Sequence, residues 1–335
     1  MAERSGLLSE REVCEVTWTM VQVARQLIGR HLVRTPLVRD EGLSDLIGGH
    51  LFLKRESSQV TGSFKVRGAL VKVLASGKNR WRKGLVCAST GNHGKGVAYL
   101  ARLLETDAWV VVPERTPTNK VRAIKELGAN VLVYGDDYCD AELMAFRLAE
   151  ERQAVLAPSF DDPWVVAAHC SIVTEILEEC PDLEVVIAPV GGGALVASCL
   201  LVRDHMKPSL RVIAVEAEGA PALTAALRAG EPVRLPFVNT VADGIAVPQI
   251  GSVPFRILSD RLSEPVVQVT DEMMDEGIRY LIRSLGIIAE HAGAAAVAAV
   301  LSQQVDDLHG RRVACLITGG NIAQDRLATI LTKER

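Results

Sequence analysis

Short apolar runs alternate with amphipathic stretches along most of this chain. The apolar runs are rich in Val, Ile, Leu and Ala and end at turn residues, as is typical of buried β-strands. They lie at residues 85–88, 108–113, 130–134, 184–190, 211–216, 265–270 and 312–318. Most segments between them show the apolar spacing of helices. This alternation predicts an α/β fold with a mainly parallel sheet.

Three other segments carry structural signals of their own. Ser9 and Glu12 form a capping box, which predicts an opening helix that runs to about Ile28. The alanine-rich stretch 292–301 predicts a buried helix, because it is apolar on every face. Residues 231–254 hold several prolines and glycines, and we expect an irregular loop there.

A lysine lies at the start of another predicted helix. The Thr-Gly-Ser turn at 61–63 can cap a helix that begins near Lys65. The apolar stripe of this helix consists of Val66, Ala69, Leu70 and Val73. Because the helix dipole disfavours a cation in the first turn, it favours the neutral amine of Lys65. The neutral amine is the form that makes a Schiff base.

Two polar turns each follow a buried strand and open a helix. Within 85–98, the turn Ser89-Thr90-Gly91-Asn92-His93-Gly94 offers hydroxyls and backbone N–H groups together, which suits a carboxylate. Within 185–197, the turn Gly191-Gly192-Gly193-Ala194 joins a strand to a helix, which is the layout of a phosphate site. For either turn alone, tight packing of the strand on the helix is an equal alternative.

Neither turn matches the better-known phosphate motifs. A dinucleotide fingerprint that starts at Gly191 would need glycine or alanine at the position of Val196. A P-loop would need serine or threonine after Lys95, where this chain has Gly96. A phosphate site, a carboxylate site and a lysine are together what pyridoxal phosphate and an amino acid require.

The composition excludes several classes of function. The chain has 335 residues, 48% of them hydrophobic, which is enough to bury a large core and build two domains. A formal net charge of −4 and the lack of basic runs argue against nucleic acid as a partner. No apolar run is long enough to span a membrane. Because charged residues and no apolar run follow Met1, we expect no secretory signal. The 7 cysteines form no C-x-x-C pair, which favours reduced thiols in the cytoplasm.

Four motifs resemble those of the serine/threonine dehydratase family, which includes the catabolic threonine dehydratases and consists of pyridoxal-phosphate enzymes of fold type II. The motifs are residues 58–69, 89–94, 189–193 and 318–321. They occur in the order that the family shows. The resemblance implies an α/β fold with two open, twisted, mostly parallel sheets flanked by helices. It also implies a small domain at 83–160, inserted into a large cofactor-binding domain made of 1–82 and 161–335.

The resemblance further implies which residues contact the cofactor. Lys65 would form the Schiff base and later take the α-proton, and Phe64 would cover one face of the ring. The phosphate would be held by the backbone N–H groups of Gly191, Gly192, Gly193 and Ala194. Asn92 would bond the 3′-oxygen, and Thr318 would lie beside the pyridine nitrogen. From the residues alone, Phe64 is equally well a core aromatic, and Thr318 could be a helix cap.

A hydroxyl at Thr318 bears on the type of reaction. It does not stabilise a pyridinium as a carboxylate would, so the ring stays mostly neutral and is a weaker electron sink. A weaker sink suits β-elimination, in which the leaving group removes the electrons, better than transamination. We therefore expect elimination on chemical grounds as well as from the resemblance.

The substrate contacts follow from the same resemblance. The substrate carboxylate would lie on Ser89, Thr90, Gly91 and His93, and the β-substituent near Gly244. His93 could instead be a buried structural histidine. In racemase relatives a serine at the position of Thr90 acts as the second acid–base. Thr90 keeps the hydroxyl as a candidate catalytic group but adds a methyl group, so racemisation is less favoured. At 290–291 the chain departs from the usual Glu-Pro pattern. A histidine near the cofactor could alter substrate choice, but we expect His291 at the surface.

The implied reaction is a β-elimination of water from a β-hydroxy-α-amino acid such as L-threonine or L-serine, which yields a 2-oxo acid and ammonia. A serine-type racemase, or a dehydratase of 3-hydroxyaspartate or of an osmolyte-derived hydroxy amino acid, remains open. The resemblance also implies a homodimer. Some relatives bind a structural divalent cation where this chain has Glu216 and the carbonyl of Ala220. Because Ala222 replaces a possible carboxylate ligand there, we expect no metal.

Overall fold

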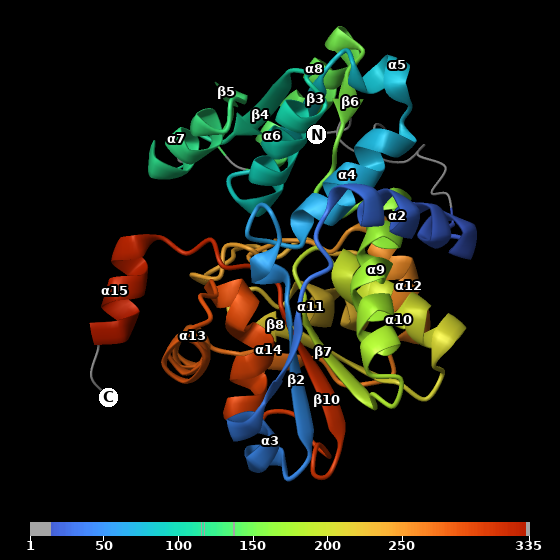
Figure 1. Cartoon of the computed structure of the whole chain (residues 1–335). Coiled ribbons are helices and arrows are strands. Elements are labelled where there is room, and N and C mark those ends of the chain that lie inside the picture. The colour runs from blue at the N-terminus through green and yellow to red at the C-terminus, as the bar shows by residue number, and fades with distance from the viewer. Residues whose placement is uncertain (1–14, 115, 117, 137, 333–335) are drawn as a thin grey trace.

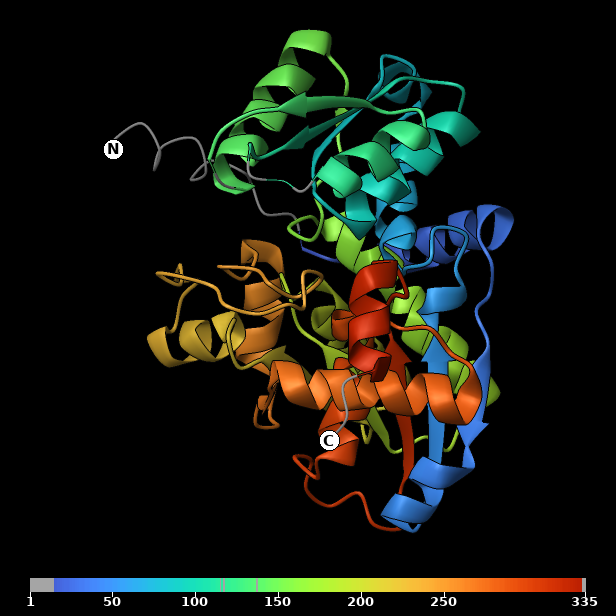
Figure 2. The ribbon, with the colours of Figure 1, turned by 90° about the vertical axis from the view of Figure 1, so that its left-hand side faces the viewer.

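The buried apolar runs build two separate sheets. The computed structural model describes residues 15–332 except 115, 117 and 137 (Figure 1). A six-stranded sheet organises a larger unit, and a four-stranded sheet organises a smaller one. Figure 1 shows the smaller unit above the larger, and the view turned by 90° in Figure 2 shows the same two layers. Among the described residues, no helix is both long and apolar enough to cross a bilayer.

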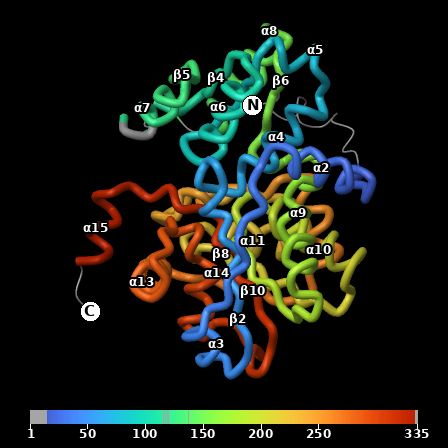
Figure 3. Tube along the Cα trace, in the orientation of Figure 1, coloured from blue at the N-terminus to red at the C-terminus, as the bar shows by residue number. Residues whose placement is uncertain are grey.

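The larger sheet joins segments from both ends of the chain. In spatial order its strands are β1 (Leu37–Asp40), β2 (His50–Arg55), β10 (Arg312–Ile317), β7 (Val185–Pro189), β8 (Arg211–Ala217) and β9 (Val267–Val269). β1 and β2 pair antiparallel, and all other neighbours pair parallel. In Figure 3 the blue β2 and the red β10 lie side by side, although more than half of the chain separates them.

Successive residues of a strand point to opposite faces of the sheet, so both faces of the larger sheet carry apolar side chains. Helices cover each of these faces. Val186 and Ala188 of β7 face one core, and Val185 and Ile187 face the other. The first core includes residues of α2 (Trp18–His31), α4 (Lys65–Ala75), α9 (Pro163–Glu179), α10 (Ala194–Met206), α11 (Ala222–Ala229) and α12 (Ser252–Arg261). The second includes residues of α3 (Glu41–Ile47), α13 (Asp271–Leu285), α14 (His291–Leu301) and α15 (Gln324–Thr332).

The smaller sheet is parallel throughout. Its strands in spatial order are β5 (Asn130–Val133), β4 (Ala108–Val112), β3 (Leu85–Ala88) and β6 (Val155–Leu156). The helices of this unit are α5 (Lys78–Trp81), α6 (Asn92–Leu103), α7 (Thr118–Glu126) and α8 (Tyr138–Arg152). Leu85 and Cys87 of β3 join the first core of the larger unit, whereas Val86 and Ala88 pack towards α8. The two units therefore share one continuous core.

The predicted α/β fold with two mostly parallel sheets is confirmed, and each of the seven predicted strands is present. Strands β1, β2 and β6 are absent from the prediction. The Ala-rich stretch is a buried helix, as predicted. The irregular segment ends at Gly251, because α12 begins at Ser252 within the predicted loop. The first described helix is α2, which begins at Trp18 after a cap at Thr17 and ends at His31. Residues 15–17 are not helical, so the prediction of one helix from Ser9 to about Ile28 is wrong. The predicted capping box of Ser9 and Glu12 lies outside the described residues.

Candidate active site

All sequence-predicted site residues line one pocket between the two units. The pocket has a volume of about 880 Å³. Its walls include the segments that follow β3, β7 and β10, and the carboxyl ends of parallel strands are where ligands bind in such sheets. The predicted residues among its lining are Phe64, Lys65, Ser89, Thr90, Gly91, Asn92, His93, Gly191, Gly192, Gly193, Ala194, Gly244 and Thr318.

The helix that carries Lys65 begins where the sequence predicts it, but it is held differently. Phe64 immediately precedes α4, and no side chain caps the N-terminus of this helix. The backbone N–H of Phe64 instead donates to the carbonyl of Thr318 at 3.1 Å. The hydroxyl of Ser63 accepts from the N–H of Lys65 at a long 3.4 Å. The end of β10, rather than the predicted Thr-Gly-Ser cap, therefore fixes the position of Lys65.

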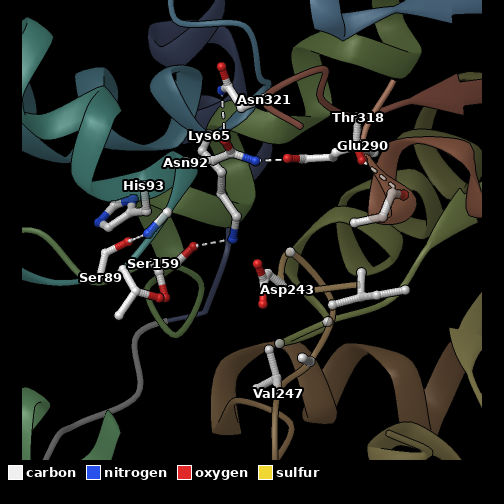
Figure 4. A pocket seen from close by; sticks show the side chains of 18 of the residues that line it. Lys65, Ser89, Asn92, His93, Ser159, Asp243, Val247, Glu290, Thr318 and Asn321 are labelled. Carbon is white, nitrogen blue, oxygen red and sulfur yellow. Dashed lines mark hydrogen bonds between the residues drawn. The ribbon is translucent and has the colours of Figure 1, made fainter. Parts of the chain in front are cut away.

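The amine of Lys65 points into the pocket (Figure 4). Its Nζ donates to the carbonyl of Ser159 at 2.9 Å. The side chain is partly exposed to the pocket, yet protein surrounds the amine, and this burial lowers the pKa of Lys65 to about 8 against the opposing charge of Glu290. A lowered pKa is what the sequence predicts, but burial rather than the helix dipole is its main cause.

The glycine turn before α10 leaves no room for side chains. A Cβ at Gly192 would overlap the ring of Phe160, and one at Gly193 would lie 2.9 Å from the Cβ of Pro254. Gly193 also has a φ of +93°, a conformation that favours glycine. Ala194 is the first residue of α10 and needs no positive φ, so an alanine is tolerated there.

The start of α10 is suited to an anion. Among the described residues, no protein group accepts a hydrogen bond from the backbone N–H groups of residues 191–194. These groups lie at the N-terminus of a helix of thirteen residues, where the helix dipole also favours negative charge. The turn thus fits a phosphate, as its sequence predicts.

The turn before α6 holds a neutral histidine. His93 is buried, and its Nε2 lies 2.7 Å from the carbonyl of Ala157. A carbonyl only accepts, so Nε2 carries the proton. Burial, and secondarily the charge of Lys65, lowers the pKa of His93 to about 4. The Nε2 atom thus serves the fold, and the contact of His93 with a substrate stays a prediction.

Thr318 follows β10 and is almost fully buried. Its hydroxyl donates to the carbonyl of Ala292 at 3.3 Å. The next helix, α15, begins only at Gln324, so Thr318 does not cap it. A bond of this length is weak, and the hydroxyl can turn towards a ligand in the pocket.

Sequence reasoning missed several residues of the pocket. The carbonyl that receives Lys65 belongs to Ser159, and no side-chain pattern reveals a backbone group. Tyr138 lies with its hydroxyl 3.3 Å from the hydroxyl of Ser159. His169 is fully buried, and the centroid of its ring lies 4.7 Å from the ring centroid of Phe64. Neither of its ring nitrogens has a hydrogen-bond partner among the described residues. As the one histidine of the apolar helix α9, His169 offered a signal in the sequence.

The surface position expected for His291 is wrong. His291 is only 4% exposed, and it lines the pocket. Its Nε2 lies 2.9 Å from the buried carboxylate of Asp275, because α13 packs over the start of α14. Burial lowers the pKa of His291 although Asp275 favours the charged form.

The carboxylate of Glu216, where some relatives bind a cation, is engaged by the protein itself. It accepts from the backbone N–H of Leu223 at 3.1 Å, from the hydroxyl of Thr224, and from the Nε2 of Gln268 at 3.1 Å. Across the part of the chain that the structure describes, no three His, Cys, Asp or Glu residues gather in a way that could hold a metal. That no metal is needed stays a prediction.

The pocket fits pyridoxal phosphate in its chemistry. A lysine with a lowered pKa, unused N–H groups at a helix start, and a buried hydroxyl line the same cavity. These are groups that could bond an aldehyde carbon, a phosphate and a ring nitrogen. The fit rests on groups from the start of α4 and from the segments that follow β7 and β10, which lie far apart in the sequence.

Comparisons with known proteins agree with this fit. A family model described as pyridoxal-phosphate dependent enzyme matches residues 28–319. An L-threonine ammonia-lyase from Thermotoga maritima is 37% identical over 95% of this chain and 79% of its own. A solved maize serine racemase has a TM-score of 0.88 and 27% identity, covering 95% of this chain and 96% of that one. The processed form of threonine deaminase isoform 2 from Solanum lycopersicum has a TM-score of 0.85 and 30% identity, covering 95% and 94%. The chain therefore belongs to the family of pyridoxal-phosphate dependent enzymes.

Proposed function

We propose that this enzyme is an ammonia-lyase that eliminates water from a β-hydroxy-α-amino acid of the L-threonine or L-serine type. The observation that carries the proposal is the meeting of Lys65, the N-terminus of α10 and the Thr318 hydroxyl in one pocket. The identity of 37% to an L-threonine ammonia-lyase supports the same reaction. The products are a 2-oxo acid and ammonia.

In this reaction the Cα–H and Cβ–O bonds of the substrate break, and the hydroxyl leaves as water. The released enamine then takes up water and gives the 2-oxo acid and ammonia. Pyridoxal phosphate, when bound, supplies the electron sink for the first step. All remaining tasks fall to side chains and backbone groups of the pocket.

Lys65 is the base in our proposal. Because burial lowers its pKa to about 8, about a tenth of the amine is neutral at pH 7 and can take a proton on Nζ. The carbonyl of Ser159 holds the same atom at 2.9 Å, which limits where the amine can lie. Phe64, which precedes Lys65, lines the pocket, and this supports its proposed role of covering one face of the cofactor.

The other proposed contacts bind and orient. The N–H groups of Gly191–Ala194 would hold the phosphate. Asn92 would bond the 3′-oxygen, and Thr318 would bond the pyridine nitrogen. The segment Ser89–His93 holds the substrate carboxylate, and Gly244 lies near the β-substituent. The buried hydroxyl of Thr318 gives no countercharge to a pyridinium, and this supports elimination over transamination.

A substrate panel tests the proposal. The release of 2-oxo acid is measured from both enantiomers of serine, threonine and 3-hydroxyaspartate, and from hydroxy amino acids that arise from osmolytes. We expect turnover of L-threonine or L-serine, and Lys65→Ala should lower it by at least about 1,000-fold, because the reaction loses its base. Lys78→Ala, which changes an exposed lysine of α5, is the matched control. Turnover that survives in the Lys65→Ala protein would refute the role of Lys65.

Racemisation is the second candidate, since a solved serine racemase matches the fold with a TM-score of 0.88. Thr90 lines the pocket, and this supports a role for its hydroxyl as the second acid–base. Chiral analysis of unreacted L-serine distinguishes the two reactions, because a racemase must produce D-serine. We expect none from this chain, and a small amount from Thr90→Ser, which removes only a methyl group.

We also propose that the enzyme works as a homodimer in the cytoplasm and has no nucleic-acid partner. The resemblance to dehydratases supports the dimer, and the net charge of −4 supports the lack of a nucleic-acid partner. Light scattering on the eluting protein should give twice the chain mass of 36.1 kDa. A mass that stays at one chain across micromolar concentrations would contradict the dimer.

A further inference from the structure

The amide of Asn92 is held on both sides by other side chains. Its Nδ2 donates to Oε1 of Glu290 at 2.5 Å, and its Oδ1 accepts from Nδ2 of Asn321 at 2.7 Å (Figure 4). The Nδ2 of Asn321 also donates to the carbonyl of Thr61 at 2.9 Å. Three segments that follow β2, α13 and β10 thus meet around one residue of α6.

These contacts allow only one orientation of the two amides. A carboxylate and a backbone carbonyl accept hydrogen bonds and cannot donate them. Glu290 must therefore face the NH₂ group of Asn92, and Thr61 must face the NH₂ group of Asn321. The oxygen of Asn92 then points to Asn321, and one N–H of Asn92 remains for the pocket.

We propose that Glu290 and Asn321 are positioning residues, which fix the Asn92 amide so that it presents an N–H to the 3′-oxygen of the cofactor. The inference rests on the proposed contact of Asn92 with the cofactor. If the amide turned over, it would present its own oxygen to that electron-rich oxygen, and the contact would become repulsive. The two residues thus decide whether Asn92 attracts or repels the cofactor.

The backbone around the pair is built for this close approach. A Cβ on Gly319 would overlap Oε1 of Glu290 and lie 3.2 Å from Nδ2 of Asn92. A Cβ on Gly62, which has a φ of +73°, would lie 2.8 Å from Oδ1 of Asn321. Glycines at both places thus make room for the two positioning residues. The backbone N–H of Glu290 donates to the carbonyl of Gly319 at 3.0 Å. This bond fixes Glu290, and with it the start of α14, relative to the end of β10.

Glu290 also brings a negative charge. It immediately precedes the first turn of α14, where the helix dipole stabilises an anion. Its charge raises the pKa of Lys65 and of Lys95, against the lowering by burial. His291 follows Glu290, and Arg326 lines the same pocket. Because Glu290 favours the protonated form of nearby bases, its replacement by a neutral side chain should lower their pKa.

Variants separate orientation from charge. Glu290→Ala removes both, Glu290→Gln keeps an acceptor oxygen without the charge, and Asn321→Ala removes the second contact. Glu41→Gln changes an exposed carboxylate as the control. The readouts are the dissociation constant of pyridoxal phosphate from the apoprotein and the pH titration of the visible absorbance of the loaded protein. Far-UV circular dichroism of each apoprotein checks folding, and Asn321→Ala serves if Glu290→Ala does not fold.

Glu290→Ala and Asn321→Ala should each weaken cofactor binding by about 3- to 10-fold, as expected for one lost hydrogen bond. Glu290→Gln should stay within about 2-fold of the parent, while the midpoint of its absorbance titration moves to lower pH. The inference fails if Glu290→Ala and Asn321→Ala bind as the control does, or if Glu290→Gln loses as much affinity as Glu290→Ala. Absence of a cofactor absorbance that depends on Lys65 in the parent protein would instead overturn the proposed function.

Discussion

Burial shifts the pKa values of titratable groups around the pocket in the direction that favours their neutral forms. It lowers the pKa of Lys65 to about 8 and that of His93 to about 4, and it raises the pKa of the Cys87 thiol above its usual range. At neutral pH, His93 and Cys87 are therefore uncharged, and the amine of Lys65 is the one closest to its titration range. Proton transfer in the pocket is thus directed to Lys65.

The lowered pKa of Lys65 predicts how cofactor capture depends on pH. The neutral amine attacks the aldehyde, so the capture rate should rise with pH and level off above about 8. At pH 7 about a tenth of the amine is neutral, against well under a thousandth for an ordinary lysine. Stopped-flow absorbance of apoprotein mixed with pyridoxal phosphate measures the rate. A midpoint near 10 would show that the amine is not buried in solution, and Lys65→Ala gives the background.

Single residues were predictable from the sequence where a motif places them. Lys65 and the glycines at 191–193 lie beside strand ends, and the chemistry of their side chains or backbone marks them. The carbonyl of Ser159 and the buried His169 lie on other segments and reach the pocket only through packing. Their roles depend on tertiary contacts, which no local pattern reports.

The backbone conformation of the turn between β7 and α10 depends on glycines, which carry no side chain. Gly193 has a φ of +93°, and a Cβ added to it would lie 2.9 Å from the Cβ of Pro254 and 3.0 Å from the Cδ1 of Leu258. An added methyl group must therefore move the backbone or α12. The anion-binding geometry of the turn depends on that backbone.

Gly193→Ala should weaken the binding of pyridoxal phosphate by at least about 10-fold, because a left-handed conformation costs an L-residue about 1–2 kcal/mol and the turn would relax away from it. Gly29→Ala is the control, since Gly29 lies in α2 with open space around it. We expect that control to stabilise the protein by about 1 kcal/mol and to leave the affinity unchanged. Fluorescence titration of the apoprotein and chemical unfolding measure both quantities. Equal affinity of the two variants would argue against a phosphate site at this turn.

Strand prediction failed for identifiable physical reasons. β2 contains His50, Lys54 and Arg55, and such charge is atypical of a central strand. Lys54 is nevertheless fully buried, because its ammonium pairs with Glu175 at 2.7 Å and donates to the carbonyl of Thr35 at 2.7 Å. Ion pairs and hydrogen bonds with other segments thus allow a charged residue of β2 to be buried, and the alternation of apolar residues does not reveal this. By contrast, all five residues of β7 are buried and apolar, and the pattern predicted this strand.

A buried ion network links segments of the whole molecule. Arg67 of α4 is fully buried and bonds Glu56 and Glu175 through both ends of its guanidinium. Lys54 of β2 also pairs with Glu175, so the network contains two cations and two carboxylates. Although burial opposes ionisation, the hydrogen bond and charge of Arg67, together with Lys54, lower the pKa of Glu175. The network holds α4 against β2 and α9.

Arg67→Met should destabilise the protein by about 3–5 kcal/mol, because it leaves two buried carboxylates with one cation. Arg122→Ala is the control, since the pair of Arg122 with Glu126 is exposed and 3.8 Å long. That control should change the free energy of unfolding by about 0.5 kcal/mol or less. Urea denaturation at neutral pH measures both. A loss below about 1 kcal/mol for Arg67→Met would mean that the network contributes specificity of packing rather than stability.

The helix α4 has a further consequence for the motion of the enzyme. Gly96 of α6 lets the smaller unit approach the backbone of Val66, and Gly68 of α4 lets His169 of α9 approach from the larger unit. If the predicted domain of residues 83–160 moves as a unit, the close contact of Gly96 with Val66 couples α4 to that movement. Lys65 is the first residue of that helix. One movement would therefore set both the opening of the pocket to substrate and the reach of the amine.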